Sequence, residues 1–117
     1  MAVSGIAFTM YPVSDLPRAK AFYRDVLGLQ PGGIETDYWF EFEVAGGTFG
    51  IGSFPQVGTP GTAQSLALEV PDLASLRETL AGRGIAVDPP HELEWCSIAV
   101  VRDPDGNQIW LHHAKPR

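Results

Sequence analysis

In the first half of the chain, apolar positions follow the period of a strand, then of a helix, then of strands again. An apolar stretch of strand length covers residues 6–13, and Asp15 follows it as a candidate helix cap. The next apolar positions recur at helical spacing and end before Gly28: Ala19, Phe22, Tyr23, Val26 and Leu27. Residues 38–44 alternate between apolar and mixed positions, and a glycine turn leads into a strand over residues 48–54.

The same order returns in the second half. Residues 65–70 alternate as a strand, and Asp72 is a second candidate helix cap. Leu73, Leu76 and Leu80 mark the inward face of a helix that ends at a glycine, Gly82 or Gly84. Three further strands are predicted over residues 85–87, 96–102 and 108–114. A turn containing proline and glycine, residues 103–107, joins the last two of these strands.

A short internal repeat links the two halves. Val13-Ser14-Asp15-Leu16 returns as Val70-Pro71-Asp72-Leu73, and each copy ends an apolar run and begins a helical stretch. Asp72 follows Asp15 after 57 residues, close to half of the 117 residues. The chain therefore predicts an α+β fold of two βαβββ modules within a single domain spanning 1–117. We place module 1 at residues 5–54, a linker at 55–63, and module 2 at 64–115.

Charge and composition narrow the partners. Eight basic and fourteen acidic residues give a net charge of −6 without a basic cluster, which argues against a nucleic-acid partner. A neutral or cationic small molecule is easier to accommodate. No stretch approaches the roughly 20 apolar residues of a membrane span, so we expect a soluble protein with no membrane partner. The single cysteine, Cys96, excludes an intramolecular disulfide and favours the cytoplasm, and we interpret it as a small apolar residue rather than a reactive thiolate.

Four motifs occur in order along nearly the whole chain: Val13-Ser14-Asp15-Leu16, residues 21–29 (AFYRDVLGL), Val70-Pro71-Asp72-Leu73, and residues 102–107 (RDPDGN). Through them the chain resembles the vicinal oxygen chelate superfamily, the group of glyoxalases, bleomycin-resistance proteins and extradiol dioxygenases. The resemblance implies two βαβββ modules with curved sheets around a cavity, with the helices on the outer face, commonly completed in a homodimer. It says less about the reaction, because one fold hosts many functions.

The resemblance also indicates where metal-using members keep their ligands. The first ligand lies seven residues before the aspartate of each Val-x-Asp-Leu motif, at Phe8 and Ser65 here. The closing glutamate follows the Asp-Gly-Asn turn at the place of Trp110, and a fourth carboxylate corresponds to Gly50. None of these side chains is a good ligand for a divalent ion. We therefore expect no metal site and no cofactor.

A relocated metal site is the alternative. His112 and His113 are neighbours on one strand, so their side chains point to opposite faces and cannot chelate one ion together. We expect His112 to face inward, where a carboxylate could join it from another strand: Glu41, Glu43 or Glu69. His91 and Glu92 follow two prolines and are expected in a loop, as an exposed polar segment or the rim of a cavity.

Side-chain alternation gives the set of residues expected to bind a ligand: Phe8, Met10, Trp39, Glu41, Glu43, Ser65, Glu69, Trp110 and His112. Gly50 and Gly52, which lack side chains, are expected to enlarge the space between these ligand-binding residues. Aromatic walls with a few carboxylates suit a planar aromatic or cationic molecule. In the alternative interpretation, the aromatic side chains fill the cavity and Glu41 and Glu43 face solvent.

We therefore predict a metal-independent small-molecule binding protein, similar to the bleomycin-resistance proteins, that forms a homodimer. One alternative is an enzyme, a glyoxalase-like lyase or isomerase or a dioxygenase, with a divalent metal at relocated ligands. A second is a dimerising domain whose cavity is plugged. Whether the protein catalyses any reaction stays open, because no side chain is singled out as a nucleophile, general acid or general base.

Overall fold

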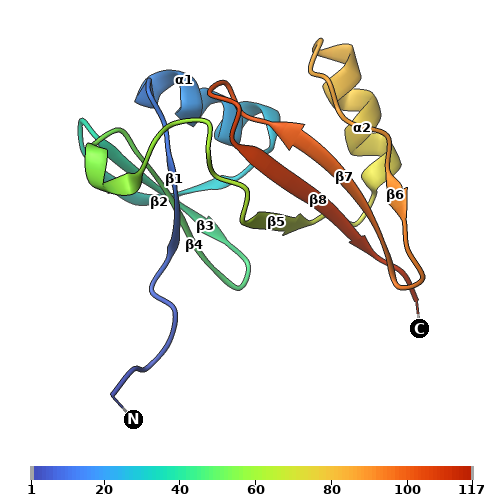
Figure 1. The fold of residues 1–117 in the computed structure, drawn as a ribbon, viewed down its shortest axis with the longest axis horizontal. Helices are drawn as coiled ribbons and strands as arrows, with labels where there is room; N and C mark the ends of the chain where they lie inside the picture. The colour runs from blue at the N-terminus through green and yellow to red at the C-terminus, as the bar shows by residue number, and fades with distance from the viewer. Residues whose placement is uncertain (1, 117) are drawn as a thin grey trace. The chain divides into compact units, whose positions relative to one another are not determined.

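The computed structural model describes residues 2–116, which divide into two compact units (Figure 1). Unit 1 extends to Ala63 and unit 2 begins at Gln64. Each unit contains a four-stranded mixed sheet and the order βαβββ, so the predicted α+β class and the two repeated modules are confirmed. None of the helices between residues 2 and 116 has the length and apolar character needed to cross a membrane.

Unit 1 has the sheet order β1-β4-β3-β2, in which β1 pairs with β4 in parallel and the other pairs are antiparallel. Helix α1 continues directly into a π-helical turn, and a short 3₁₀ helix follows the last strand. The elements are β1 (Thr9–Pro12), α1 (Leu16–Ala21), the π-helix (Phe22–Val26), β2 (Gln30–Glu35), β3 (Trp39–Val44), β4 (Gly47–Gly52) and the 3₁₀ helix (Pro55–Val57).

Unit 2 repeats this arrangement with the sheet order β5-β8-β7-β6. The parallel pair is β5 with β8, and the other neighbours are antiparallel. The elements are β5 (Leu66–Glu69), α2 (Leu73–Gly82), β6 (His91–Glu92), β7 (Cys96–Arg102) and β8 (Gln108–Ala114).

The repeated Val-x-Asp-Leu motif begins both helices. Asp15 accepts a hydrogen bond from the Arg18 backbone N–H at 3.1 Å, and Asp72 accepts one from the Ser75 N–H at 3.0 Å. Each aspartate thus satisfies an N–H group that has no partner within the first helical turn. Because both caps lie directly after a strand, the motif fixes where each chain segment leaves its sheet.

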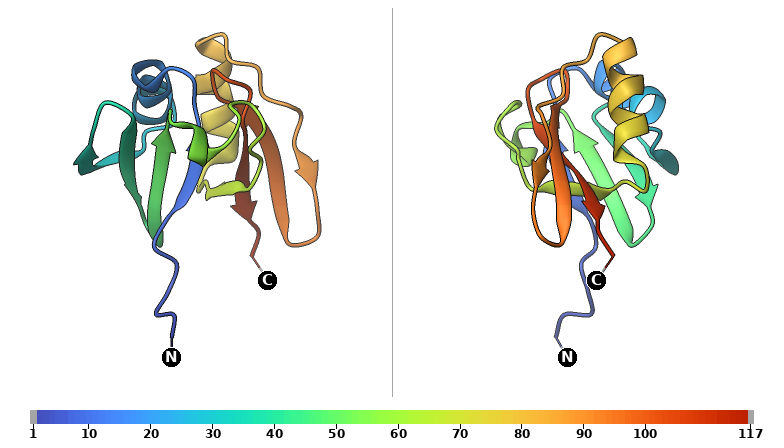
Figure 2. Two further views of the ribbon diagram at one scale, coloured as in Figure 1. Left: turned by 60° about the vertical axis from the view of Figure 1, so that its left-hand side comes forward. Right: turned by 90° about the vertical axis from the view of Figure 1, so that its right-hand side faces the viewer.

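Each helix packs on one face of its own sheet, and this face holds the core of the unit (Figure 2). In unit 1 the core is aromatic, with the Tyr23 ring 5.1 Å from that of Phe49 and close to Phe42. In unit 2 the core is aliphatic and lies under α2, which contributes Leu73 and Leu80. Strands β7 and β8 contribute the other buried residues: Ala99, Val101, Ile109 and Leu111. We call the opposite side of each sheet its helix-free face.

The structure adds two edge strands and shortens the first strand. Strand β2 covers Pro31-Gly32-Gly33, a stretch for which the sequence analysis predicts no strand, and its register with β3 shifts between Pro31 and Glu35. Strand β6 contains His91 and Glu92, so the loop expected there is wrong. Strand β1 begins at Thr9, and Phe8 lies just before it. In place of the strand expected over 85–87, the structure has a single bridge between Val87 and Val101.

Candidate small-molecule binding site

The helix-free face of unit 1 combines aromatic side chains with carboxylates. Strand β3 contributes alternate residues to it, and the register pairs Trp39 with Gly52 and Glu41 with Gly50. Phe8 and Met10 are each 43% exposed at the β1 side of this face. The predicted site residues of the first module therefore share one face of one sheet.

Trp39 fills the room above the two glycines. A Cβ atom on Gly50 would lie 2.3 Å from Cζ2 of Trp39, and one on Gly52 would lie 2.9 Å from its Cε3. Both distances are far below van der Waals contact, so the indole lies directly on the glycine backbone. We expected Gly50 and Gly52 to enlarge an open space, and this expectation is wrong, because the Trp39 ring occupies that space.

Neighbouring groups hold the Trp39 ring in place. Its Nε1–H donates to Glu41 Oε2 at 2.9 Å, and the Phe8 ring meets it edge-on with centroids 5.3 Å apart. Glu41 is half-buried, whereas Glu43 is exposed and accepts a hydrogen bond from the Thr48 hydroxyl at 3.3 Å. One of the two carboxylates is thus committed to Trp39, and the other lies at the solvent-exposed part of the strand.

The helix-free face of unit 2 has two rows of side chains that run across β5, β8 and β7. In the first row, Trp110 lies between Ala67 and Val100. In the next row, His112 lies between Glu69 and Ile98. Trp110 is 41% exposed, and beside it lies a hollow of about 250 Å³. The hollow is lined by Gln64, Ser65, Leu66, Ala67 and Trp110.

Glu69 uses both carboxylate oxygens on strand β8. Oε1 lies 2.5 Å from His112 Nδ1, and Oε2 accepts the backbone N–H of Ala114 at 2.8 Å. The hydrogen bond from Ala114, followed by that from His112, lowers the pKa of Glu69 below its ordinary value of 4.5. Of the three carboxylates considered as partners of His112, Glu69 is thus in direct contact with it.

The places of the family's metal ligands do not fit a metal. Phe8, Gly50 and Trp110 offer no donor atom for a divalent ion, and Ser65 offers a neutral hydroxyl. Among residues 2–116, no group of three or more His, Cys, Asp or Glu side chains could hold a metal ion. His113 lies on the opposite face from His112, with Nδ1 2.8 Å from the Val70 carbonyl oxygen.

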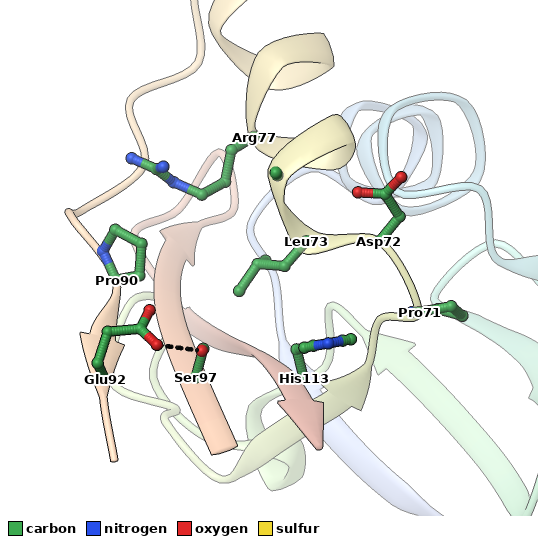
Figure 3. Close-up of a pocket in the computed structure, with 9 residues that line it drawn as sticks. Pro71, Asp72, Leu73, Arg77, Pro90, Glu92, Ser97 and His113 are labelled. Carbon is green, nitrogen blue, oxygen red and sulfur yellow. Dashed lines mark hydrogen bonds between the residues drawn. The ribbon is translucent and has the colours of Figure 1, made fainter. Parts of the chain in front are cut away.

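A second hollow, of about 290 Å³, lies on the helix side of unit 2, and sequence reasoning missed most of its lining (Figure 3). Ser97 donates to Glu92 Oε1 at 2.7 Å, and Lys115 Nζ lies 2.9 Å from the same oxygen. The signal that could have indicated it is Ser97, a buried polar residue in an apolar strand. The lining is Pro71, Asp72, Leu73, Ala74, Arg77, Pro90, Glu92, Ser97 and His113.

Comparison of the chain with known proteins identifies its family. A family profile described as the Glyoxalase/Bleomycin resistance protein/Dioxygenase superfamily matches residues 5–111. The chain belongs to this superfamily. A search of curated protein sequences returned no significant match.

Solved structures of other proteins have a similar fold. TnmS3, an antibiotic binding protein from Streptomyces sp. CB03234, is 30% identical, with a TM-score of 0.86 and coverage of 98% of this chain and 99% of its own. A glyoxalase/bleomycin resistance protein from the same organism is 29% identical, with a TM-score of 0.77 and coverage of 95% and 100%. Lactoylglutathione lyase from Agrobacterium tumefaciens is 22% identical, with a TM-score of 0.79 and coverage of 95% and 94%. At that identity the lyase supports the fold alone.

Proposed function

We propose that this superfamily member is a metal-independent binding protein for a planar aromatic or cationic small molecule. The observation that carries the proposal is Trp110, which is 41% exposed beside a hollow on the helix-free face of unit 2. It stands where the resemblance indicates a metal-binding glutamate in metal-using relatives. An indole at that place offers a flat apolar surface instead of a ligand to a metal.

The chemistry of the helix-free faces supports such a ligand. An aromatic ring can stack on the exposed face of Trp110, and a cation there gains about 0.5–2 kcal/mol from the indole. Glu69 adds negative charge close to Trp110 on the sheet of unit 2. Separately, the sheet of unit 1 carries Glu41 and Glu43 on its own helix-free face. The 30% identity to an antibiotic binding protein, over almost the full length of both chains, is consistent with a binding role.

Fluorescence titration tests the binding role directly. The chain has three tryptophans, and Trp95, which is 51% exposed before β7, serves as the control position. Titration with a panel of planar aromatic and cationic compounds should change the emission of the wild-type protein. Trp110→Ala should weaken binding about tenfold, whereas Trp95→Ala should leave affinity unchanged. Unchanged affinity in Trp110→Ala would remove this side chain from the site.

Two further parts of the proposal need their own measurements. Elemental analysis of the purified protein should find no stoichiometric metal, and about one Ni, Zn, Fe or Mn per chain would contradict metal independence. We also propose a homodimer that acts in the cytoplasm. Sedimentation should give twice the mass of one chain, and a monomer at micromolar concentration would contradict the dimer.

A further inference from the structure

The contact between Glu69 and His112 is held more firmly than an ordinary surface ion pair. Beyond the end of β5 at Glu69, the Val70 N–H still donates to the His112 carbonyl, and the Val70 carbonyl oxygen lies 2.8 Å from His113 Nδ1. The Ala114 N–H farther along β8 bonds to the Glu69 side chain. Glu69 Oε2 accepts this N–H at 2.8 Å, and Oε1 lies 2.5 Å from His112 Nδ1. With each oxygen engaged on β8, the carboxylate is fixed in position and orientation relative to the imidazole.

This arrangement determines which imidazole nitrogen carries the proton. An ionised carboxylate only accepts hydrogen bonds, so the Nδ1 atom of His112 must be the donor. In the neutral ring, Nε2 is then left as the acceptor. No hydrogen bond to Nε2 is present among residues 2–116, and the His112 side chain remains 33% exposed.

The acceptor atom lies on the same face as the exposed indole. His112 follows Trp110 by two residues on β8, so their Cα atoms are about 7 Å apart and their side chains leave the same side of the sheet. Ile98 and Val100 flank the two residues from β7. The face therefore joins a flat aromatic surface to one hydrogen-bond acceptor of defined tautomer.

We infer that His112 Nε2 accepts a hydrogen bond from the ligand and so selects aromatic molecules that carry a donor, such as a phenolic hydroxyl, at the ring edge. Glu69 is the positioning residue, because it holds His112 in the accepting tautomer. The inference rests on the proposed binding function and narrows it to donor-bearing aromatic rings.

Glu69→Gln separates this role from a purely structural one. The glutamine side chain has one oxygen for the Ala114 N–H, and its NH₂ group then faces His112 Nδ1. The imidazole must accept at Nδ1, which moves its proton to Nε2. The variant thus keeps the cap on Ala114 and reverses the hydrogen-bonding role of the nitrogen that we assign to the ligand.

The first measurement concerns the protein without ligand. Nitrogen-15 NMR of the three histidines, assigned with His91→Gln and His113→Gln, should show the Nδ1–H tautomer for neutral His112 and the Nε2–H tautomer in Glu69→Gln. An Nε2–H tautomer in the wild-type protein would overturn the inference, whatever the ligand.

The second measurement compares 2-naphthol with its methyl ether, which lacks the donor. Wild-type protein should bind 2-naphthol about two- to tenfold more tightly, and Glu69→Gln should abolish this preference. His112→Phe, which keeps a ring but removes the acceptor, should abolish it too and serves if Glu69→Gln does not fold. His113→Gln, whose imidazole bonds to Val70 on the other face, should retain the preference.

Different results would overturn the role of His112 and the proposed binding function. Equal wild-type affinity for 2-naphthol and its ether overturns the role of His112 and leaves the binding function standing. If no compound of the aromatic and cationic panel binds, the proposed function is overturned, and the role of His112 in ligand choice falls with it.

Discussion

At equivalent positions, the two sheets carry their large aromatic side chain on different strands. In unit 1, strand β4 carries Gly50 and Gly52, and the neighbouring strand β3 covers them with the Trp39 ring. In unit 2, the corresponding strand β8 carries Trp110 and His112, and its neighbour β7 offers Val100 and Ile98. One tryptophan lies flat on glycine backbone, and the other remains 41% exposed.

This difference shows that an aromatic residue at an inward position has two distinct roles. Trp39 has a hydrogen-bond partner in Glu41 and a ring contact with Phe8, so it serves as part of the packed structure of unit 1. Trp110 lies beside small Ala67 at an open hollow and is available to a ligand. The two modules thus share a topology, but one packs its tryptophan against the sheet and the other leaves its tryptophan exposed.

The largest expected effect on stability comes from removing the tryptophan of each sheet in turn. Trp39→Ala should lower the free energy of unfolding by about 2–3 kcal/mol, because it removes a partly buried indole and uncovers two glycines. Trp110→Ala should lower it by less than about 1 kcal/mol, because its ring is exposed. Urea denaturation of both variants checks the prediction. Equal losses would contradict the assignment of one ring to packing and the other to binding.

A smaller effect tests the contact beneath Trp39. Gly50→Ala places a Cβ 2.3 Å from the indole and should cost about 1–3 kcal/mol, since the ring must move. Gly47→Ala in the same strand is the matched control, because a Cβ there meets no atom within 4 Å. Alanine favours a strand more than glycine does, so the control should be neutral or slightly stabilising. Unfolding curves that coincide for the two variants would show that Trp39 is not held against Gly50.

The smallest expected effect concerns acid. The pKa of Glu69 is lowered by the Ala114 and His112 hydrogen bonds, so its stabilisation is complete above the ordinary value of 4.5 and is lost as pH falls through the lowered pKa. Glu69→Gln should therefore reduce the fall in melting temperature between pH 6 and pH 3. Glu78→Gln, at an exposed position of α2, is the control. A melting profile identical to that of the wild-type protein would remove Glu69 from the pH dependence.

Local signals predicted most of the fold. The caps at Asp15 and Asp72 each depend on hydrogen bonds within three residues, and the strands Cys96–Arg102 and Gln108–Ala114 have the bounds that the sequence indicated. Strands β2 and β6 were missed because they are edge strands without a period-two pattern, and Pro31-Gly32-Gly33 is typical of a turn. Their pairing is decided by neighbouring strands.

Side-chain alternation predicted which site residues share a face of a sheet, but not which of them are in contact. Alternation assigns Glu69 and His112 to one face, but their contact depends on the register between β5 and β8, which lie far apart in sequence. The same limit applies to Trp39, whose position over Gly50 follows from the register of β3 with β4. The hollow that contains Arg77 and Ser97 combines a helix with residues of three strands, and no single periodic segment reveals it.

The tight turn between β7 and β8 has a consequence for evolution of the binding face. Asp103 and Asn107 are buried, and Asp103 accepts hydrogen bonds from the Asn107 backbone N–H at 3.0 Å and from its side-chain amide at 2.8 Å. A one-residue deletion or insertion here would turn every side chain of β8 to the other face. Ile109, Leu111 and His113 would then occupy the face that now carries Trp110 and His112, so the proposed ligand preference depends on the length of this turn.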